Sequence, residues 1–143
     1  MISVERSMAL ERPAEEVLRY LADFGHTVEW DPGTEACVRL DPGPVATGSR
    51  WRNTSRFRGR RTDLEYRLEE YRSDRLVFVG HNSTVTATDD ITLRASGDRT
   101  LVVYRASLRF HGLARLAAPF LTGEFERLAD AVAERLPRVL AAH

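Results

Sequence analysis

Polar and apolar positions alternate along two long stretches in the middle of the chain, and this alternation predicts two β-hairpins. A two-residue turn at Gly59-Arg60 closes the first hairpin and gives it a mostly apolar inner face, with Trp51 opposite Leu68, Asn53 opposite Tyr66 and Phe57 opposite Thr62. The outer face of the same hairpin then pairs opposite charges, Arg50 with Glu69 and Arg56 with Asp63.

The second hairpin turns at Gly97-Asp98 and has a similar inner face, with Leu93 opposite Val102, Ile91 opposite Tyr104 and Ala87 opposite Leu108. Register fixes which set of side chains is buried, so one face of a long antiparallel sheet is expected to be apolar and aromatic, with a few polar atoms. A face of this composition is compatible with a lined cavity as well as with a solid core.

The remaining elements follow from the same patterns. Residues 2–10 alternate as a half-buried strand, and Pro13 begins a helix that ends at Gly25. A short turn or helix then passes through Trp30. Six further strands are expected near residues 35–41, 47–58, 61–71, 75–81, 84–95 and 100–110. The register of the strand near 75–81 against both neighbours stays open, because either pairing can contain a bulge.

From residue 113 onwards the apolar period becomes helical, and Pro119 and Gly123 are expected to kink this helix or split off its first turn. The order of elements predicts an α+β fold, in one domain over residues 1–143. A curved seven-stranded antiparallel sheet wraps around the long C-terminal helix, and two short helices follow the first strand. The apolar stripe of the long helix consists of Leu113, Leu116, Phe120, Leu121, Phe125, Leu128, Val132, Leu136 and Leu140.

Composition narrows the range of functions. The 21 basic residues, all arginine, balance 21 acidic ones, so no net charge favours nucleic acid or an anionic membrane, and no lysine is present to form a Schiff base. Six arginines cluster in the first hairpin, and alternation puts most of them on a solvated outer face: Arg50, Arg52, Arg56, Arg58, Arg60 and Arg61. Neither a signal sequence nor a membrane-spanning run is evident, which favours a cytoplasmic protein.

Motifs for metal and cofactor binding are not found in the sequence. Cys37 is the single cysteine, which excludes an intrachain disulfide and a thiolate cluster. The four histidines do not have ligand spacing, and no nucleophile elbow, dinucleotide loop or phosphate-binding loop occurs. We therefore expect neither a metal nor a cofactor.

Several short stretches make the chain similar to a known family. They are Pro13-Ala14-Glu15-Glu16-Val17, Glu29-Trp30-Asp31-Pro32-Gly33, Gly48-Ser49-Arg50-Trp51 and Asp89-Asp90-Ile91, together with the long terminal helix. With the order of elements, they resemble the helix-grip fold of the START/Bet v 1-like (SRPBCC) superfamily, and within it the bacterial polyketide cyclase/dehydrase and lipid-transport-like group. The resemblance spans essentially the whole chain. It implies a fold but no catalytic signature, and Trp30 and Pro32 resemble fold-determining positions.

The resemblance implies a cavity between the sheet and the terminal helix, which would bind a small hydrophobic or aromatic ligand. Strand parity and the helical stripe nominate its walls: Trp30, Trp51, Asn53, Phe57, Tyr66, Phe78, Tyr104, Leu108, Phe120, Phe125 and Leu128. A filled core, with tyrosine hydroxyls reaching its rim, is the alternative interpretation of the same side chains.

Five inward polar residues are weak catalytic candidates: Arg6, Asn53, Tyr66, Asp89 and Tyr104. A buried charge without a partner is costly. Arg6 and Asp89 must therefore be paired, lie at an open end of the sheet, or face outwards. If they face the cavity, Arg6 could hold an oxyanion, Asp89 could act as a base, and the tyrosines could donate to a carbonyl.

Three functions remain open at this point. The first is a carrier or binding module for a polyketide-like or lipid-like molecule, and the second is a cofactor-independent cyclase or dehydratase. The third is a chaperone-activator-like module for protein interaction, which predicts a filled interior and an exposed patch. The chain is expected to be a monomer or homodimer without nucleic-acid binding or stable membrane insertion.

Overall fold

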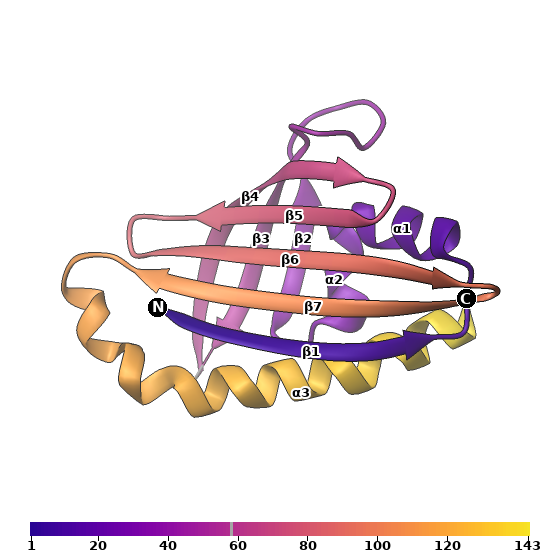
Figure 1. Cartoon of the computed structure of the whole chain (residues 1–143). Helices are drawn as coiled ribbons and strands as arrows, with labels where there is room; N and C mark the ends of the chain where they lie inside the picture. Colours follow the sequence, from indigo (N-terminus) through magenta and orange to yellow (C-terminus); the bar gives the residue numbers. More distant parts are fainter. Residues whose placement is uncertain (58) are drawn as a thin grey trace.

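Seven antiparallel strands form one sheet in the computed structural model, which describes every residue except Arg58. Figure 1 shows that the sheet is bent, with β2–β4 running across behind β5–β7. The order across the sheet is β1-β7-β6-β5-β4-β3-β2, which confirms the predicted topology class. The strands are β1 (Ile2–Leu10), β2 (Thr34–Arg39), β3 (Arg50–Phe57), β4 (Arg60–Arg72), β5 (Arg75–His81), β6 (Val85–Ser96) and β7 (Arg99–Phe110).

The helices lie where the sequence places them. The connection from β1 to β2 contains α1 (Ala14–Ala22), the 3₁₀ helix η1 (Phe24–His26) and α2 (Thr27–Trp30). After β7, η2 (Gly112–Ala117) leads into the long helix α3 (Ala118–Ala142), which runs beside β1 in Figure 1. Pro119 stands in the first turn of α3, where its missing N–H costs no helical hydrogen bond. The 3₁₀ helix η2 precedes it as a separate turn, whereas α3 continues through Gly123 as one helix.

The two hairpins differ in how well their register was predicted. The β6–β7 hairpin has the expected pairs, including Ile91 opposite Tyr104. The β3–β4 hairpin is displaced by two residues, so Trp51 lies opposite Tyr66 and Phe57 opposite Arg60. Gly59 takes the positive φ of 77° that a tight turn needs, one position later in the loop than predicted. A displacement of two preserves the faces, because side chains alternate with a period of two.

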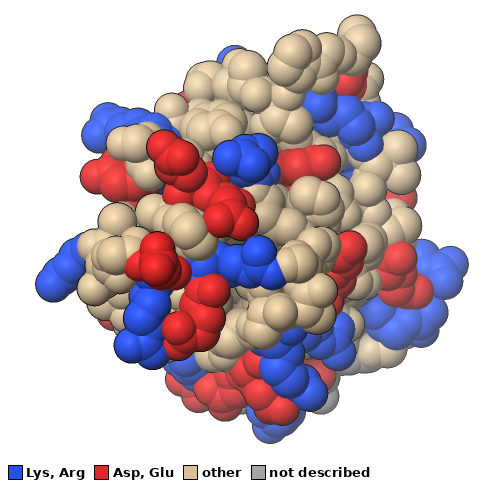
Figure 2. Space-filling view, turned by 90° about the vertical axis from the view of Figure 1, so that its right-hand side faces the viewer, with Lys and Arg blue, Asp and Glu red and all other residues tan. Residues whose placement is uncertain are grey.

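The displacement also changes the charge pairs on the outer face. Arg50 contacts Glu65 at 3.4 Å instead of Glu69, and Arg56 contacts Glu35 of β2 at 3.5 Å instead of Asp63. The arginines of this hairpin are exposed, as expected, except that Arg58 lies outside the described residues. Figure 2 shows a similar mixture of arginine and acidic side chains on the end of the molecule where the C-terminus lies.

A register shift occurs in β4 between Leu68 and Glu70, in one of the two pairings that the sequence left open. Leu68 is fully buried, and after the shift Tyr71, rather than Glu70, packs against the core. The irregularity therefore resets the alternation in a strand that is 13 residues long.

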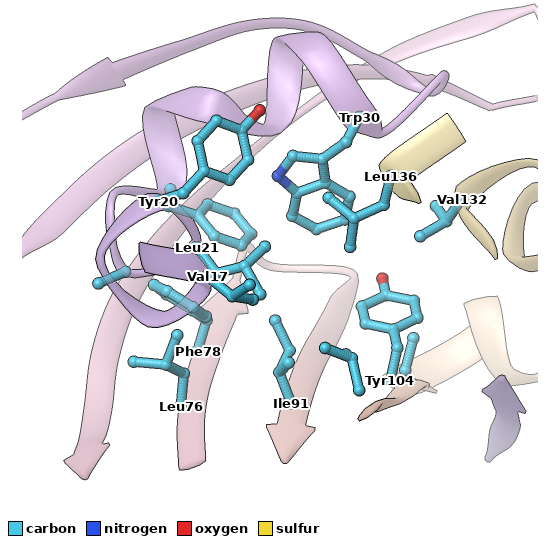
Figure 3. Close-up of a cluster of buried hydrophobic side chains, with 14 of the residues drawn as sticks. Val17, Tyr20, Leu21, Trp30, Leu76, Phe78, Ile91, Tyr104, Val132 and Leu136 are labelled. Carbon is cyan, nitrogen blue, oxygen red and sulfur yellow. The ribbon is translucent and has the colours of Figure 1, made fainter. Parts of the chain in front are cut away.

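The packed core occupies one half of the concave face. Val17 and Leu21 of α1 point onto β5 and β6, and Trp30 lies beside Leu136 of α3 (Figure 3). Only the C-terminal half of the predicted stripe of α3 is buried, in Val132, Leu136 and Leu140. The N-terminal part of the stripe is exposed instead, because it lies beyond the part of the sheet that α1 and α2 cover. Leu113 is 86% exposed, Leu116 73% and Phe120 76%.

Gly80 is required beneath the ring of Tyr66. A Cβ added at Gly80 would lie 2.7 Å from the ring carbons of Tyr66, which is closer than van der Waals contact allows. We expect Gly80→Ala to lower the free energy of unfolding by about 1–3 kcal/mol through overpacking, measured by urea denaturation. Gly123→Ala is the matched control, because its Cβ would meet only Arg127, at 3.8 Å, within a helix. The control should gain up to about 1 kcal/mol. Equal stability of the two variants would contradict the prediction.

Candidate functional site

A cavity of about 160 Å³ lies between the other half of the concave face and α3. Its walls are largely apolar and come from β1, β3, β4, β6, β7 and α3. The polar side chains in the cavity wall include those of Asp31, Asn53, Tyr66, Asp89 and Tyr104. Apolar walls with a few placed polar groups are typical of sites for small molecules.

Seven of the residues nominated from the sequence border this cavity: Asn53, Phe57, Tyr66, Tyr104, Leu108, Phe125 and Leu128. Trp30, Trp51 and Phe78 do not; they are at most 1% exposed and belong to the packed core. Phe120 does not reach the interior either, since it is 76% exposed. Four of the eleven nominated wall positions therefore lie away from this cavity.

Phe24 is the reason that Trp51 and Phe78 face no open space. Its ring centroid lies 4.4 Å from that of Phe78, 4.5 Å from that of Tyr66 and 6.1 Å from that of Trp51. The 3₁₀ helix η1 thus inserts a ring into this half of the sheet and fills it. Trp30 packs edge-on against Tyr104, at 5.9 Å between centroids.

Arg6 lies outside the cavity. Its Nε donates to Asp130 Oδ1 of α3 at 2.8 Å, and its side chain is 27% exposed. The sequence left three possibilities for Arg6, and the structure shows that its charge is paired. The ion pair joins the edge strand β1 to α3, so the positive charge of Arg6 does not lie in the cavity.

Asp89 is the buried carboxyl group of the site. Asp89 is only 8% exposed, and the Tyr104 hydroxyl donates a hydrogen bond to its Oδ2 at 3.3 Å. Burial, and then the charge of Asp31, raise the pKa of Asp89 to about 7, while the bond from Tyr104 acts in the opposite direction. Among the described residues, none forms an ion pair with this carboxyl group, so the partner that the sequence analysis allowed for it is missing.

Asp31 is the residue that the sequence analysis did not single out. It follows α2, and its carboxylate accepts hydrogen bonds from the Gly33 N–H and the Thr34 hydroxyl, both at 3.0 Å. Burial raises the pKa of Asp31, while these two bonds and the charge of Arg135 act to lower it. An aspartate two residues before a turn glycine is usually a local turn-former, so the sequence carried no signal of a place in the cavity wall.

Asn53 and Tyr66 differ in the number of hydrogen bonds that their polar groups form. The Asn53 amide donates to Thr34 Oγ1 at 3.1 Å and to Thr27 Oγ1 at 3.4 Å, and so ties β3 to the α2–β2 segment. The Tyr66 hydroxyl, by contrast, has no hydrogen-bond partner among the described residues, although Tyr66 is only 7% exposed. Burial first, and then the charge of Asp89, raise the pKa of Tyr66 well above its usual value.

Two of the histidines lie against the same tyrosine: the ring centroid of Tyr20 is 4.3 Å from that of His26 and 5.0 Å from that of His143. His111 lies elsewhere and contacts Thr86 at 2.8 Å. In the part of the chain that the structure describes, no three side chains of the metal-binding types come together, and no helix is long and apolar enough to cross a membrane.

The protonation of Asp89 makes folding stability depend on pH. Between about pH 4 and pH 7 the folded state keeps this proton and the unfolded state releases it, so stability falls as pH rises through that window. We expect wild type to lose on the order of 4 kcal/mol relative to Asp89→Asn between pH 4 and pH 8.5, measured by urea unfolding. Asp90→Asn is the control, since Asp90 binds Arg75 at 2.7 Å on the outer face. A pH dependence in Asp89→Asn as steep as in wild type would contradict this prediction.

Solved structures with this arrangement are known. A START superfamily protein from Mycobacterium smegmatis matches with a TM-score of 0.81 and 13% identity, over 98% of this chain and 97% of that one. The Zhui aromatase/cyclase from Streptomyces sp. R1128 matches with a TM-score of 0.74 and 17% identity, over 97% and 93% of the two chains. At these identities the likeness shows the fold alone.

Sequence comparison supplies the family. No curated protein sequence matches the chain. A family model described as polyketide cyclase / dehydrase and lipid transport, however, matches residues 1–141. With the helix-grip arrangement of START-like structures confirmed, the chain belongs to the polyketide cyclase/dehydrase and lipid-transport family.

Proposed function

We propose that this chain binds a small hydrophobic or aromatic molecule in the cavity between the sheet and α3. The observation that carries the proposal is the cavity itself. Its walls combine apolar side chains such as Leu108, Phe125 and Leu128 with the buried polar groups of Tyr66 and Asp89. Membership of a family described by cyclases, dehydrases and lipid transport supports the same conclusion.

The volume of the cavity limits the size of what it holds. A protein cavity of about 150 Å³ takes up benzene, whereas drug-sized ligands need pockets of about 300–1,000 Å³. The 160 Å³ here therefore suits a single-ring molecule. A larger polyketide-like or lipid-like ligand would require outward movement of the rim, where Phe125 and Leu128 are only half-buried.

Catalysis is the second candidate function, and Asp89 favours it. A carboxyl group with a pKa of about 7 can take or give a proton near neutral pH, which suits a cyclase or dehydratase working without a cofactor. Tyr104 donates to this carboxyl group, and Tyr66 has an unused O–H for a developing enolate. The third candidate, a protein-interaction module, calls for a filled interior, and the cavity favours the other two.

A larger side chain in the cavity wall should weaken the binding of a ligand there. We expect Leu108→Trp to weaken the binding of a single-ring aromatic ligand at least tenfold, measured by calorimetric titration, because the larger ring takes up the space. Leu101→Trp is the matched control on the same strand; it faces the other side of the sheet, where Leu101 is 39% exposed, and should bind as wild type does. Native mass spectrometry of gently purified protein adds a second readout. Equal binding by both variants, or no ligand in either experiment, would count against the proposal.

Substitutions of the inward-facing polar residues distinguish a carrier from an enzyme. If the chain catalyses a cyclisation, Asp89→Asn should reduce kcat for a poly-β-ketone substrate by about 10²–10⁴-fold with little change in binding. If it is a carrier, Asp89→Asn, Tyr66→Phe and Asn53→Ala should alter affinity alone. The comparison of turnover with affinity for each variant is the measurement. Unchanged turnover in Asp89→Asn would exclude Asp89 as the acid or base.

A further inference from the structure

Two polar groups in the cavity wall have unused hydrogen-bonding capacity. The Tyr66 hydroxyl has no partner among the described residues. Asp89 accepts from Tyr104 through Oδ2, while no described residue donates to its Oδ1. Both residues are more than nine-tenths buried and border the same cavity, and the charge of Asp89 is one cause of the raised pKa of Tyr66. Tyr66 therefore supplies a free donor and Asp89 a free acceptor to the cavity, beside the hydroxyls of Ser55, Thr62 and Ser107, which are only half-buried.

Among the described residues, the cavity lining has no uncommitted positive charge to match a negative ligand. Asp31 and Asp89 both border it, and the one basic residue among the described lining is Arg56. The guanidinium of Arg56 is committed to Glu35 and to the Gly59 carbonyl on the exposed side of the hairpin. Arg6, a basic side chain of inward parity, is bound to Asp130. A ligand carboxylate would thus enter a buried site that already holds two acidic groups.

We propose that the polar end of the ligand is a neutral hydroxyl group, phenolic or enolic, and that the cavity rejects carboxylates. The hydroxyl donates its proton to Asp89 Oδ1 and accepts from the Tyr66 O–H, so that both unused groups become paired. An ammonium group could donate to Asp89 but would leave the Tyr66 proton without an acceptor. This inference rests on the proposed ligand-binding function and narrows its ligand class.

Three single-ring probes that differ only at the polar end test the inference: 4-ethylphenol, 4-ethyltoluene and 4-ethylbenzoate. At pH 8, we expect the phenol to bind about 5–10-fold more tightly than the methyl analogue, since a net hydrogen bond contributes about 1 kcal/mol. The benzoate should bind at least 100-fold more weakly than the phenol. Calorimetric or NMR titration of the intact chain gives the three dissociation constants.

Variants assign the selectivity to the two side chains. Tyr66→Phe should remove most of the advantage of the phenol over 4-ethyltoluene, and Asp89→Asn should narrow the gap between phenol and benzoate at least tenfold. Asp90→Asn, on the outer face of the same strand, should behave as wild type. Tyr66→Phe alone suffices if Asp89→Asn does not fold.

The outcomes distinguish the inference from the function on which it rests. If 4-ethyltoluene or the benzoate binds as tightly as the phenol, the hydroxyl preference is wrong while ligand binding stands. If none of the three probes binds, the proposed function fails and the inference fails with it. Wild-type selectivity in both Tyr66→Phe and Asp89→Asn would also overturn it, because other groups would then select the ligand.

Discussion

The packing of helices onto only one half of a bent sheet is the constraint on which the rest of this structure depends. Phe24 of η1 inserts among the rings of Trp51, Tyr66 and Phe78 and closes that half. Trp30 and Leu136 join the C-terminal half of α3 to the same core. Aromatic packing of this kind contributes both area burial and specific ring contacts. The opposite half of the concave face has no inserted element, and its space persists beneath the N-terminal half of α3.

Because helices cover only one half of the sheet, the buried polar groups differ in how many hydrogen-bond partners the protein gives them. Asn53 and Asp31 lie where the α2–β2 segment meets β3, and hydrogen bonds from neighbouring residues occupy them. Tyr66 and Asp89 face the unfilled half, where the protein supplies fewer partners. An unpaired buried polar group costs about 1–3 kcal/mol, and more if it is charged. Groups left in this condition are characteristic of a functional site, because a ligand can supply the missing partner.

The sequence predicted the elements and faces well, because alternation and turn residues are local signals. The β6–β7 register followed from the turn at Gly97-Asp98. In the β3–β4 hairpin, Gly59 could be either the first or the second residue of the turn, and these two choices give registers that differ by two residues. Which aromatic side chains face the open space was not accessible in this way. Trp51, Tyr66 and Phe78 all have inward parity, and Phe24, far away in the chain, packs against all three, yet of these three Tyr66 alone borders the cavity. The role of Asp31 depends likewise on a distant neighbour, Asp89.

Carrier and enzyme use the same physical features of this cavity, and differ only in what happens after the ligand enters. A carboxyl group kept half-protonated by burial is a hydrogen-bond acceptor for a resting ligand and a proton acceptor for a reactive one. Arg6, which would have supplied an oxyanion partner, is instead bound to Asp130, so the charge of an enolate would depend on the tyrosine hydroxyls alone. Since neutral donors stabilise such a charge less than a cation does, the proposed binding of an already formed phenol demands less of this cavity than the proposed generation of one.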